Sequence, residues 1–234
     1  MIRIGTIRVG TAALVAAMAL SAFAQSADVA SPFNGKDLAG WKLKGNNEAK
    51  SKWKVGKASP DPAAPNKFVF AEGGNELVNT AGGGVDIHSE YKHGNAVIEV
   101  ELMVPKGSNS GVYVMGEYEV QVLDSFGKVK VGAGDLGGLY GAAAPKKNAS
   151  KAPGEWQKFV IDFVAPRFDG KKKTVNAKFL KVTLNDHVMH ENAEVLKGAT
   201  PGGLSGSEAP VGPLMFQGDH EPVAFRNVKI TPKK

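Results

Sequence analysis

The short segment Glu117–Asp124, in which polar and apolar residues alternate, holds the side chains best suited to acid–base chemistry. A β-strand directs successive side chains to opposite faces, so Glu117, Glu119 and Gln121 share one face and neighbours lie roughly 6.5–7 Å apart. Tyr113, on the preceding strand, is expected on the same face. Carboxylates, an amide and an aromatic ring on one face are typical of a sugar-binding site, although a plain solvated surface is the alternative.

A second candidate group is the segment Gln217-Gly218-Asp219-His220. His220 follows a predicted strand in a glycine-containing loop, where functional side chains are over-represented. The alternative is a histidine with only a structural hydrogen bond. His187 and His190 fall on opposite faces of their strand, which argues against a shared metal site. The sequence therefore predicts no cofactor and no metal ligands, although a divalent cation is compatible with the chemistry described below.

Arg226 interrupts an apolar pattern near the C-terminus. Strict alternation would place it on the inward face with Ala224, Val228 and Ile230. Such a position predicts either a β-bulge or an ion pair with a buried carboxylate. A structural ion pair is the preferred interpretation for Arg226, with a ligand contact as the second.

The elements that position these residues are predicted to be strands, because apolar residues recur at every second position. No segment shows sustained helical periodicity, and 29 glycines and 13 prolines indicate many turns. This pattern predicts an all-β protein, an antiparallel β-sandwich or jelly roll. The predicted strands are Asn95–Val104, Val112–Met115, Tyr118–Leu123, Phe159–Val164, Lys178–Leu184, His187–His190, Leu214–Gln217 and Val223–Ile230.

The N-terminal residues 1–24 are predicted to be a secretory signal peptide. Arg3 and Arg8 precede an apolar run that ends in Ala22-Phe23-Ala24. The run is shorter than the roughly 20 residues of a membrane-spanning helix, so we expect no membrane anchor. Residues 25–234 are then predicted to form one domain. The short, alanine-rich signal peptide resembles those of bacteria, so we expect a periplasmic or secreted protein.

Composition excludes several classes of function. The sequence has no cysteine, which rules out disulfides, thiolate metal sites and cysteine nucleophiles. The formal charge of +6 falls to +4 when the two leader arginines are removed. The lysine clusters that remain lie beside glycine, proline or asparagine without interleaved aromatic residues, so no nucleic-acid partner is expected.

Several segments of the sequence form a recognisable series: Phe33–Trp41, Trp53–Val55, Asn109–Tyr113, Tyr118–Asp124, Gly138–Tyr140, Pro153–Trp156, Gly212–Gln217 with His220, and Phe225–Val228. Taken together, these segments resemble the 3-keto-disaccharide hydrolase domain family of bacteria. They occur in order along nearly the whole predicted mature chain, and the opening motif and the Glu-x-Gln-x-x-Asp stretch are the most specific. The resemblance implies a concanavalin A-like or laminin-G-like jelly roll that acts on glycosides with a ketone at C3.

A C3 ketone acidifies the proton at C2, so a base can remove it and the resulting enolate can expel the substituent at C1. Hydration then completes the hydrolysis. This route needs a base, hydrogen-bond donors for the enolate and an acid for the leaving group. We assign Glu119 as the base, His220 as the acid, and Gln121 and Arg226 as the donors; Asp124 is a loop ligand or an orienting group.

Two other functions fit the same residues. Glu117 and Glu119 could form the carboxylate pair of a retaining glycosidase, which requires a separation of about 5–5.5 Å. A carbohydrate-binding module would use the aromatic and amide contacts without a base. All three readings predict a carbohydrate ligand, and the first also predicts a pathway link to an oxidoreductase that forms the 3-keto sugar.

Overall fold

The protein is an antiparallel β-sandwich, as the sequence predicts. The computed structural model describes Met1 and residues 28–234, so the predicted signal peptide lies outside the described residues apart from Met1. One sheet has five strands in the order β1-β4-β13-β6-β7. These strands are β1 (Trp41–Leu43), β4 (Ile87–His93), β6 (Asn109–Val114), β7 (Tyr118–Leu123) and β13 (Gly212–Phe216).

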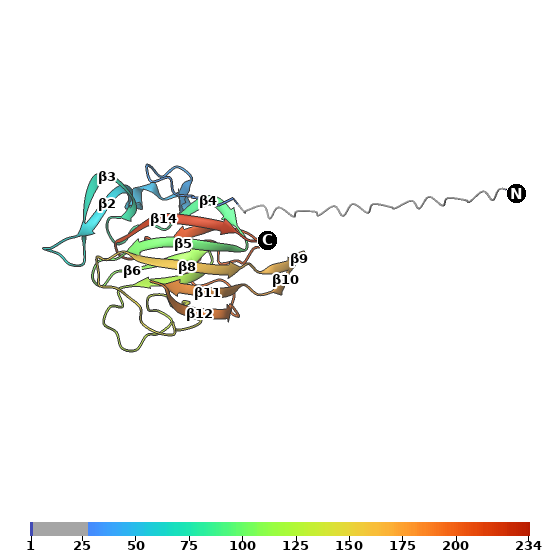
Figure 1. Cartoon of the computed structure of the whole chain (residues 1–234). Coiled ribbons are helices and arrows are strands. Elements are labelled where there is room, and N and C mark those ends of the chain that lie inside the picture. Colours follow the sequence, from blue (N-terminus) through green and yellow to red (C-terminus); the bar gives the residue numbers. More distant parts are fainter. Residues whose placement is uncertain (2–27) are drawn as a thin grey trace.

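The second sheet has seven strands in the order β12-β11-β8-β5-β14-β3-β2. Figure 1 shows β14, β5, β8, β11 and β12 one below another. A two-stranded ribbon, β9 (Arg167–Asp169) and β10 (Lys172–Val175), and two short 3-10 helices, η1 (Lys44–Asn46) and η2 (Glu48–Lys50), complete the elements. The seven strands are β2 (Trp53–Pro60), β3 (Phe68–Asn79), β5 (Ala96–Met103), β8 (Gln157–Val164), β11 (Lys178–Leu184), β12 (His187–Glu194) and β14 (Val223–Pro232).

The core lies between the two sheets, where aromatic rings from both inner faces meet. Phe216 of β13 stacks on Phe225 of β14 with ring centroids 3.9 Å apart. Tyr118 of β7 contacts Phe163 of β8 at 5.4 Å. Because Tyr118, Val120 and Val122 face this core, the alternate side chains of β7 are directed to the outer face of the five-stranded sheet.

A β-bulge in β14 explains why simple alternation misplaces Arg226. Asn227 has a φ of 52°, and the register of β14 against β5 shifts between Arg226 and Lys229. Phe225 before the bulge and Val228 after it therefore both enter the core, although they are three residues apart. Arg226 is directed to the outer side of its sheet, where it bonds Glu101.

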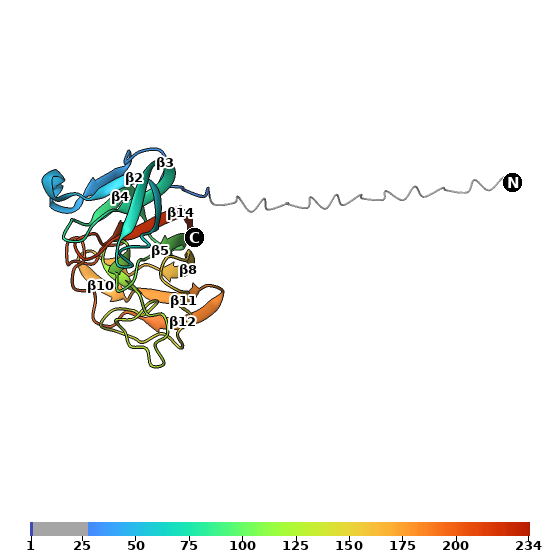
Figure 2. The ribbon, with the colours of Figure 1, turned by 90° about the vertical axis from the view of Figure 1, so that its left-hand side faces the viewer.

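The long connection between β7 and β8, residues 124–156, packs against β12. The backbone N–H of Lys146 donates to the carbonyl of Met189, and the Gly137 carbonyl bonds the His190 ring. Figures 1 and 2 show this connection as a group of loops beside β11 and β12. Its residues 137–140 also pair with the free edge of β7. Within the part of the chain that is described, no helix has the length and apolarity needed to cross a bilayer.

Candidate active site

Glu119 is the second residue of β7, and only 4% of its surface is exposed. Tyr113 is its cross-strand partner on β6, and the Tyr113 hydroxyl donates to Oε2 of Glu119 over 2.9 Å. Burial raises the pKa of the Glu119 carboxyl to about 7, and the hydrogen bond from Tyr113 and the nearby His220 oppose this rise. Glu119 therefore titrates near neutrality, where a general base works best.

Gly111 makes room for the Glu119 carboxylate. It lies on β6 opposite Gln121, two residue pairs along the ladder from Tyr113 and Glu119. A Cβ atom at Gly111 would stand 2.5 Å from Oε1 of Glu119 and 2.8 Å from Cε2 of Tyr113. The absence of a side chain at this position is what lets the carboxylate lie flat against the sheet.

A cavity of about 230 Å³ opens above these residues on the outer face of the five-stranded sheet. It brings together four of the predicted site residues, from β6, β7 and the loop after β13. Its volume is below the roughly 300–1,000 Å³ of sites that enclose a drug-sized ligand, so it suits one sugar ring. The lining residues are Asn109, Tyr113, Glu119, Gln121, Tyr140, Pro201, Gly202, Gln217, Asp219 and His220.

The contacts of the Gln121 amide correct its assignment as a donor to the substrate. Its Nε2 donates to Oδ1 of Asn109 at 2.7 Å and lies 3.3 Å from the carbonyls of Ser110 and Val122. Its Oε1 is buried and has no protein partner among the described residues, and the same is true of Oε1 of Gln217. Buried acceptors of this kind select ligands with hydroxyl donors.

The loop that carries Asp219 and His220 is held firmly on both sides. The buried Asn79 side chain donates to the carbonyls of Gly218 and Glu221. Asp219 Oδ1 bonds Nδ1 of His220 at 2.5 Å, which leaves Nε2 as the ring atom available to a ligand. His220 is therefore oriented by its neighbour in the way that an acid–base histidine requires.

Asp86 joins this loop to the loop on the opposite side of the cavity. Its Oδ1 accepts from the Gly218 N–H at 3.0 Å, and its Oδ2 lies 3.1 Å from Nζ of Lys44. Lys44 in turn donates to the carbonyl of Gly202 at 2.7 Å. A single buried carboxylate thus fixes the spacing of both loops.

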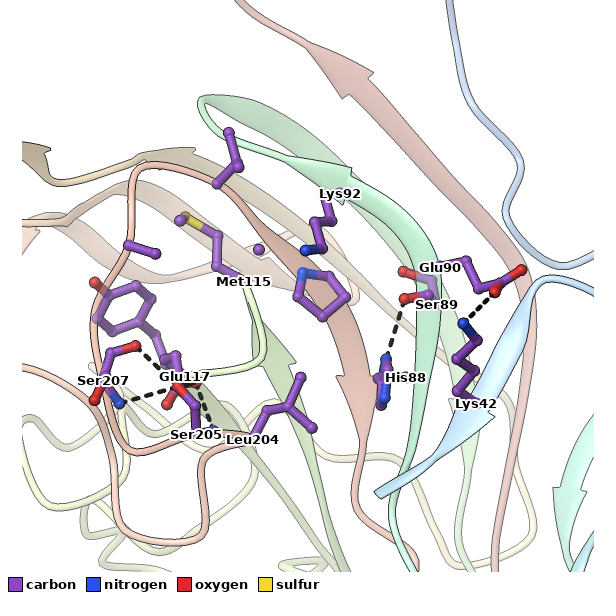
Figure 3. A pocket seen from close by; sticks show the side chains of 15 residues that line it. Lys42, His88, Ser89, Glu90, Lys92, Met115, Glu117, Leu204, Ser205 and Ser207 are labelled. Atoms are coloured by element: carbon purple, nitrogen blue, oxygen red, sulfur yellow. Dashed lines mark hydrogen bonds and ion pairs between the residues drawn. The ribbon is translucent and has the colours of Figure 1, made fainter. Parts of the chain in front are cut away.

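Glu117 does not join Glu119, and the predicted carboxylate pair is wrong. Met115 and Gly116 both have positive φ, so Glu117 belongs to the turn before β7 and not to the strand. Its carboxylate accepts from the backbone of Ser205 and Gly206 and braces their loop. Figure 3 shows it in a separate hollow of about 490 Å³, across from His88 and Lys92. This hollow is larger, but Glu119 does not line it.

Asp124 also lies outside the cavity, which corrects its assignment as a substrate ligand. The strand ends at Leu123, and the Asp124 carboxylate accepts from the backbone N–H groups of Gly107 at 2.9 Å and Phe126 at 3.3 Å. Of its two predicted roles, orientation of a loop is the one that these contacts fit.

Arg226 lies on the other sheet, so it cannot serve as a donor beside Glu119. Its Nε donates to Oε2 of Glu101 at 2.7 Å, and its guanidinium lies 3.9 Å from the centre of the Trp156 ring. The preferred interpretation, a structural ion pair, agrees with these contacts. Trp156 is covered by this guanidinium, and Trp41 and Trp53 belong to the core.

We expect Arg226→Met to lower the free energy of unfolding by about 1–2 kcal/mol, because it removes a partly buried ion pair and a cation–π contact. Chemical denaturation measures this change. Lys229→Met, an exposed change on the same strand, is the matched control. Enzymatic activity should be unaffected by either variant. A loss of activity in a folded Arg226→Met protein would show that Arg226 does contribute to the active site.

Six of the lining residues had no predicted site role: Asn109, Tyr140, Pro201, Gly202, Gln217 and Asp219. Gln217 and Asp219 were named only as part of the candidate segment that contains His220. Asn109, Gly111 and Tyr113 alternate along β6, so the period of two could have identified Asn109. No local pattern identifies Tyr140, which reaches the cavity because residues 137–140 pair with the edge of β7. Among the residues described, no cluster of three or more His, Asp or Glu side chains is placed to hold a metal ion.

Comparison with known proteins points in the same direction as this geometry. The family model described as 3-keto-alpha-glucoside-1,2-lyase-like domain matches residues 28–231. A solved structure of a presumed glycosyl hydrolase from Parabacteroides distasonis is 24% identical with a TM-score of 0.67, covering 88% of this chain and 84% of that chain. A second from the same organism is 19% identical with a TM-score of 0.61, covering 88% and 94%. No curated protein gave a match.

Proposed function

Because the chain belongs to the 3-keto-alpha-glucoside-1,2-lyase-like domain family, we propose that it cleaves glycosides whose C3 hydroxyl has been oxidised to a ketone. The family makes it a carbohydrate-active protein of the glycosyl hydrolase or lyase type. The observation that carries the finer proposal is Glu119, the buried carboxylate of the cavity lining, which has a pKa near 7 in a cavity sized for one sugar ring. Asp219, the other carboxylate of the lining, is exposed and bonds His220. A single base, and not a carboxylate pair, is what proton abstraction beside a ketone requires.

In the proposed reaction, Glu119 removes the proton from C2 and the electron pair passes to the C3 oxygen as an enolate. The enolate then re-forms the ketone as a C1–C2 double bond develops and the C1–O bond breaks. The leaving oxygen takes a proton from His220. Addition of water, with its oxygen at C1 and a proton at C2, gives net hydrolysis; release before hydration gives a lyase.

The enolate needs donors, and Gln121 and Arg226 do not provide them. Two other groups on the cavity wall are suitable. The Nδ2 of Asn109 belongs to a side chain whose Oδ1 already accepts from Gln121, and Tyr140, which carries a hydroxyl donor, is part of the same lining. We propose that these two groups stabilise the developing charge at the C3 oxygen.

The test compares a 3-keto-glucoside with the matching ordinary glucoside. We expect turnover of the keto substrate only, with a primary isotope effect when C2 carries deuterium. Binding of either sugar without turnover would support the carbohydrate-binding module instead. Turnover of the ordinary glucoside at an equal rate would contradict proton abstraction at C2.

We expect kcat/KM to rise with pH and to reach half its maximum near pH 7, because Glu119 acts only when deprotonated. Tyr113→Phe removes a hydrogen bond that stabilises the carboxylate. The pKa of Glu119 should rise further, and the profile should move to higher pH. Rates measured between about pH 5 and pH 9 check both statements. A profile that stays in place in Tyr113→Phe would show that another group controls the rate.

The proposed substrate is itself a product of oxidation, so the reaction must follow an oxidoreductase that forms the C3 ketone. We propose that both act outside the cytoplasm, in the periplasm or beyond, in agreement with the predicted signal peptide. Detection of that peptide's removal after residue 24 in exported protein tests the location.

A further inference from the structure

A second hollow, of about 790 Å³, lies on the other side of His220. His220 lines both this hollow and the cavity that contains Glu119. The partition beside it is made by Asn109 and Glu221, which exchange backbone and side-chain hydrogen bonds: the Glu221 N–H donates to the Asn109 carbonyl, and Oε2 of Glu221 accepts from the Asn109 N–H at 3.1 Å. The two spaces therefore meet at His220.

The wall of the second hollow is built from loops that hold one another in place. Lys106 donates its backbone N–H to the carbonyl of Pro65, and the Gly83 N–H donates to the carbonyl of His220 at 2.9 Å. A Cβ atom at Gly82 would stand 2.5 Å from that same His220 carbonyl oxygen. The close approach of these loops makes the hollow a fixed feature beside the site.

The charge of this hollow differs from that of the first cavity. Lys67 and Lys106 both line it, and neither ammonium group is in an ion pair within the described part of the chain. The carboxylate of Glu221, which also lines it, is already bonded to the Asn109 N–H. Two lysines without partners at one hollow favour a ligand that carries a carboxylate or a phosphate.

We infer that the second hollow binds the leaving group of the substrate, and that it selects leaving groups with an anionic substituent. This inference rests on the proposed function, in which His220 gives its proton to the leaving oxygen. An acid in that role must lie between the sugar ring and the group that departs. His220 lies between the cavity that contains Glu119 and the second hollow. The first cavity takes the 3-keto ring, and Lys67 and Lys106 face the anion on the other side.

The experiment uses two 3-keto-glucosides of nearly the same shape. One has 4-hydroxybenzoate as its leaving group and is anionic, and the other has 4-hydroxybenzamide and is neutral. The measured quantity is the ratio of kcat/KM for the anionic substrate to that for the neutral one. Comparing this ratio between the wild type and variants cancels the different leaving abilities of the two phenols.

We expect Lys67→Met and Lys106→Met each to lower this ratio about threefold, and the double variant to lower it roughly tenfold, as for partly exposed charge pairs. The rate for the neutral substrate should stay at the wild-type value. Added salt should lower the wild-type ratio and leave that of the double variant almost unchanged. Lys92→Met, at an exposed lysine of the hollow in Figure 3, is the matched control and should leave the ratio at its wild-type value.

Two results would overturn the inference. The first is normal turnover of both substrates with a ratio that the lysine variants leave unchanged, which would keep the proposed function and remove the anionic subsite. The second is an equal fall in Lys92→Met, which would indicate only the overall charge of the protein. If neither substrate is turned over, the proposed function fails. Calorimetric titration with 4-hydroxybenzoate then tests the anionic subsite by itself. The subsite requires 4-hydroxybenzoate to bind more weakly to the double lysine variant than to the wild type, and equal binding would overturn it.

Discussion

Glu119→Gln is expected to lower kcat for a 3-keto-glucoside about a thousandfold, which is within the usual contribution of a general base. The substitution keeps the size of the side chain and its hydrogen bond with Tyr113, so the cavity should be preserved. Only the ability to accept the C2 proton is lost. Steady-state rates on a 3-keto-glucoside measure the effect.

The same substitution should stabilise the protein at alkaline pH. The native pKa of Glu119 is raised to about 7 from 4.5, so the unfolded chain releases its proton first as pH rises. Stability is then lost between about pH 4.5 and pH 7, by an amount on the order of 3 kcal/mol. Glutamine carries no charge, so the advantage of Glu119→Gln over wild type should be larger at pH 8 than at pH 4 by about this amount.

Glu72→Gln is the control for both measurements, because Glu72 is exposed on β3, away from the cavity lining. It should keep full activity and the same pH dependence of unfolding as the wild type. Full activity in Glu119→Gln would show that Glu119 is not the base. Equal stability differences at pH 4 and pH 8 would show that its carboxyl is not desolvated in the native state.

Gly111→Ala is expected to lower activity about a hundredfold, because displacing a catalytic group by about 1 Å has effects of this size. The new Cβ would lie 2.5 Å from the Glu119 carboxylate and 2.8 Å from the Tyr113 ring. Both side chains are buried, so neither moves away freely. Stability should fall by about 1–3 kcal/mol, as for other overpacked sites.

Gly132→Ala provides the comparison for this variant. Gly132 lies in the connection between β7 and β8, and the nearest atom to a Cβ there is 3.9 Å away. Rates and unfolding curves for the two variants should be measured together. Wild-type activity in a folded Gly111→Ala protein would contradict the tight fit between β6 and the carboxylate of Glu119.

Strands with regular alternation could be predicted from the sequence together with their bounds, whereas β2 and β3, whose alternation is interrupted, were missed. Tyr118–Leu123 and Lys178–Leu184 have the predicted bounds. β2 and β3 were missed, because their register shifts between Gly56 and Lys57, and Ala71 and Glu72 of β3 are exposed in succession. A strand that extends beyond the body of the sheet has no buried face to produce a period of two.

The candidate site shows the same limit. Tyr113, Glu119 and Gln121 could be placed on one face because they lie on two neighbouring regular strands. Glu117 and Arg226 could not be placed, since a turn with positive φ precedes the first and a bulge at Asn227 follows the second. The turn leaves Glu117 outside β7, and the bulge reverses the parity of β14 after Arg226; neither has a signature that alternation alone detects.

The last strands of the chain occupy interior positions in both sheets, and this order constrains how the protein folds. β13 lies between β4 and β6, and β14 lies between β5 and β3. Until residues 212–232 insert, each sheet is two separate halves with unpaired edges that invite aggregation. Pairing across such sequence separations is slow. We therefore expect a nascent chain to need protection until residues 212–232 have been made and inserted, and enzymatic activity to appear only in the last phase of refolding, when His220 joins Glu119.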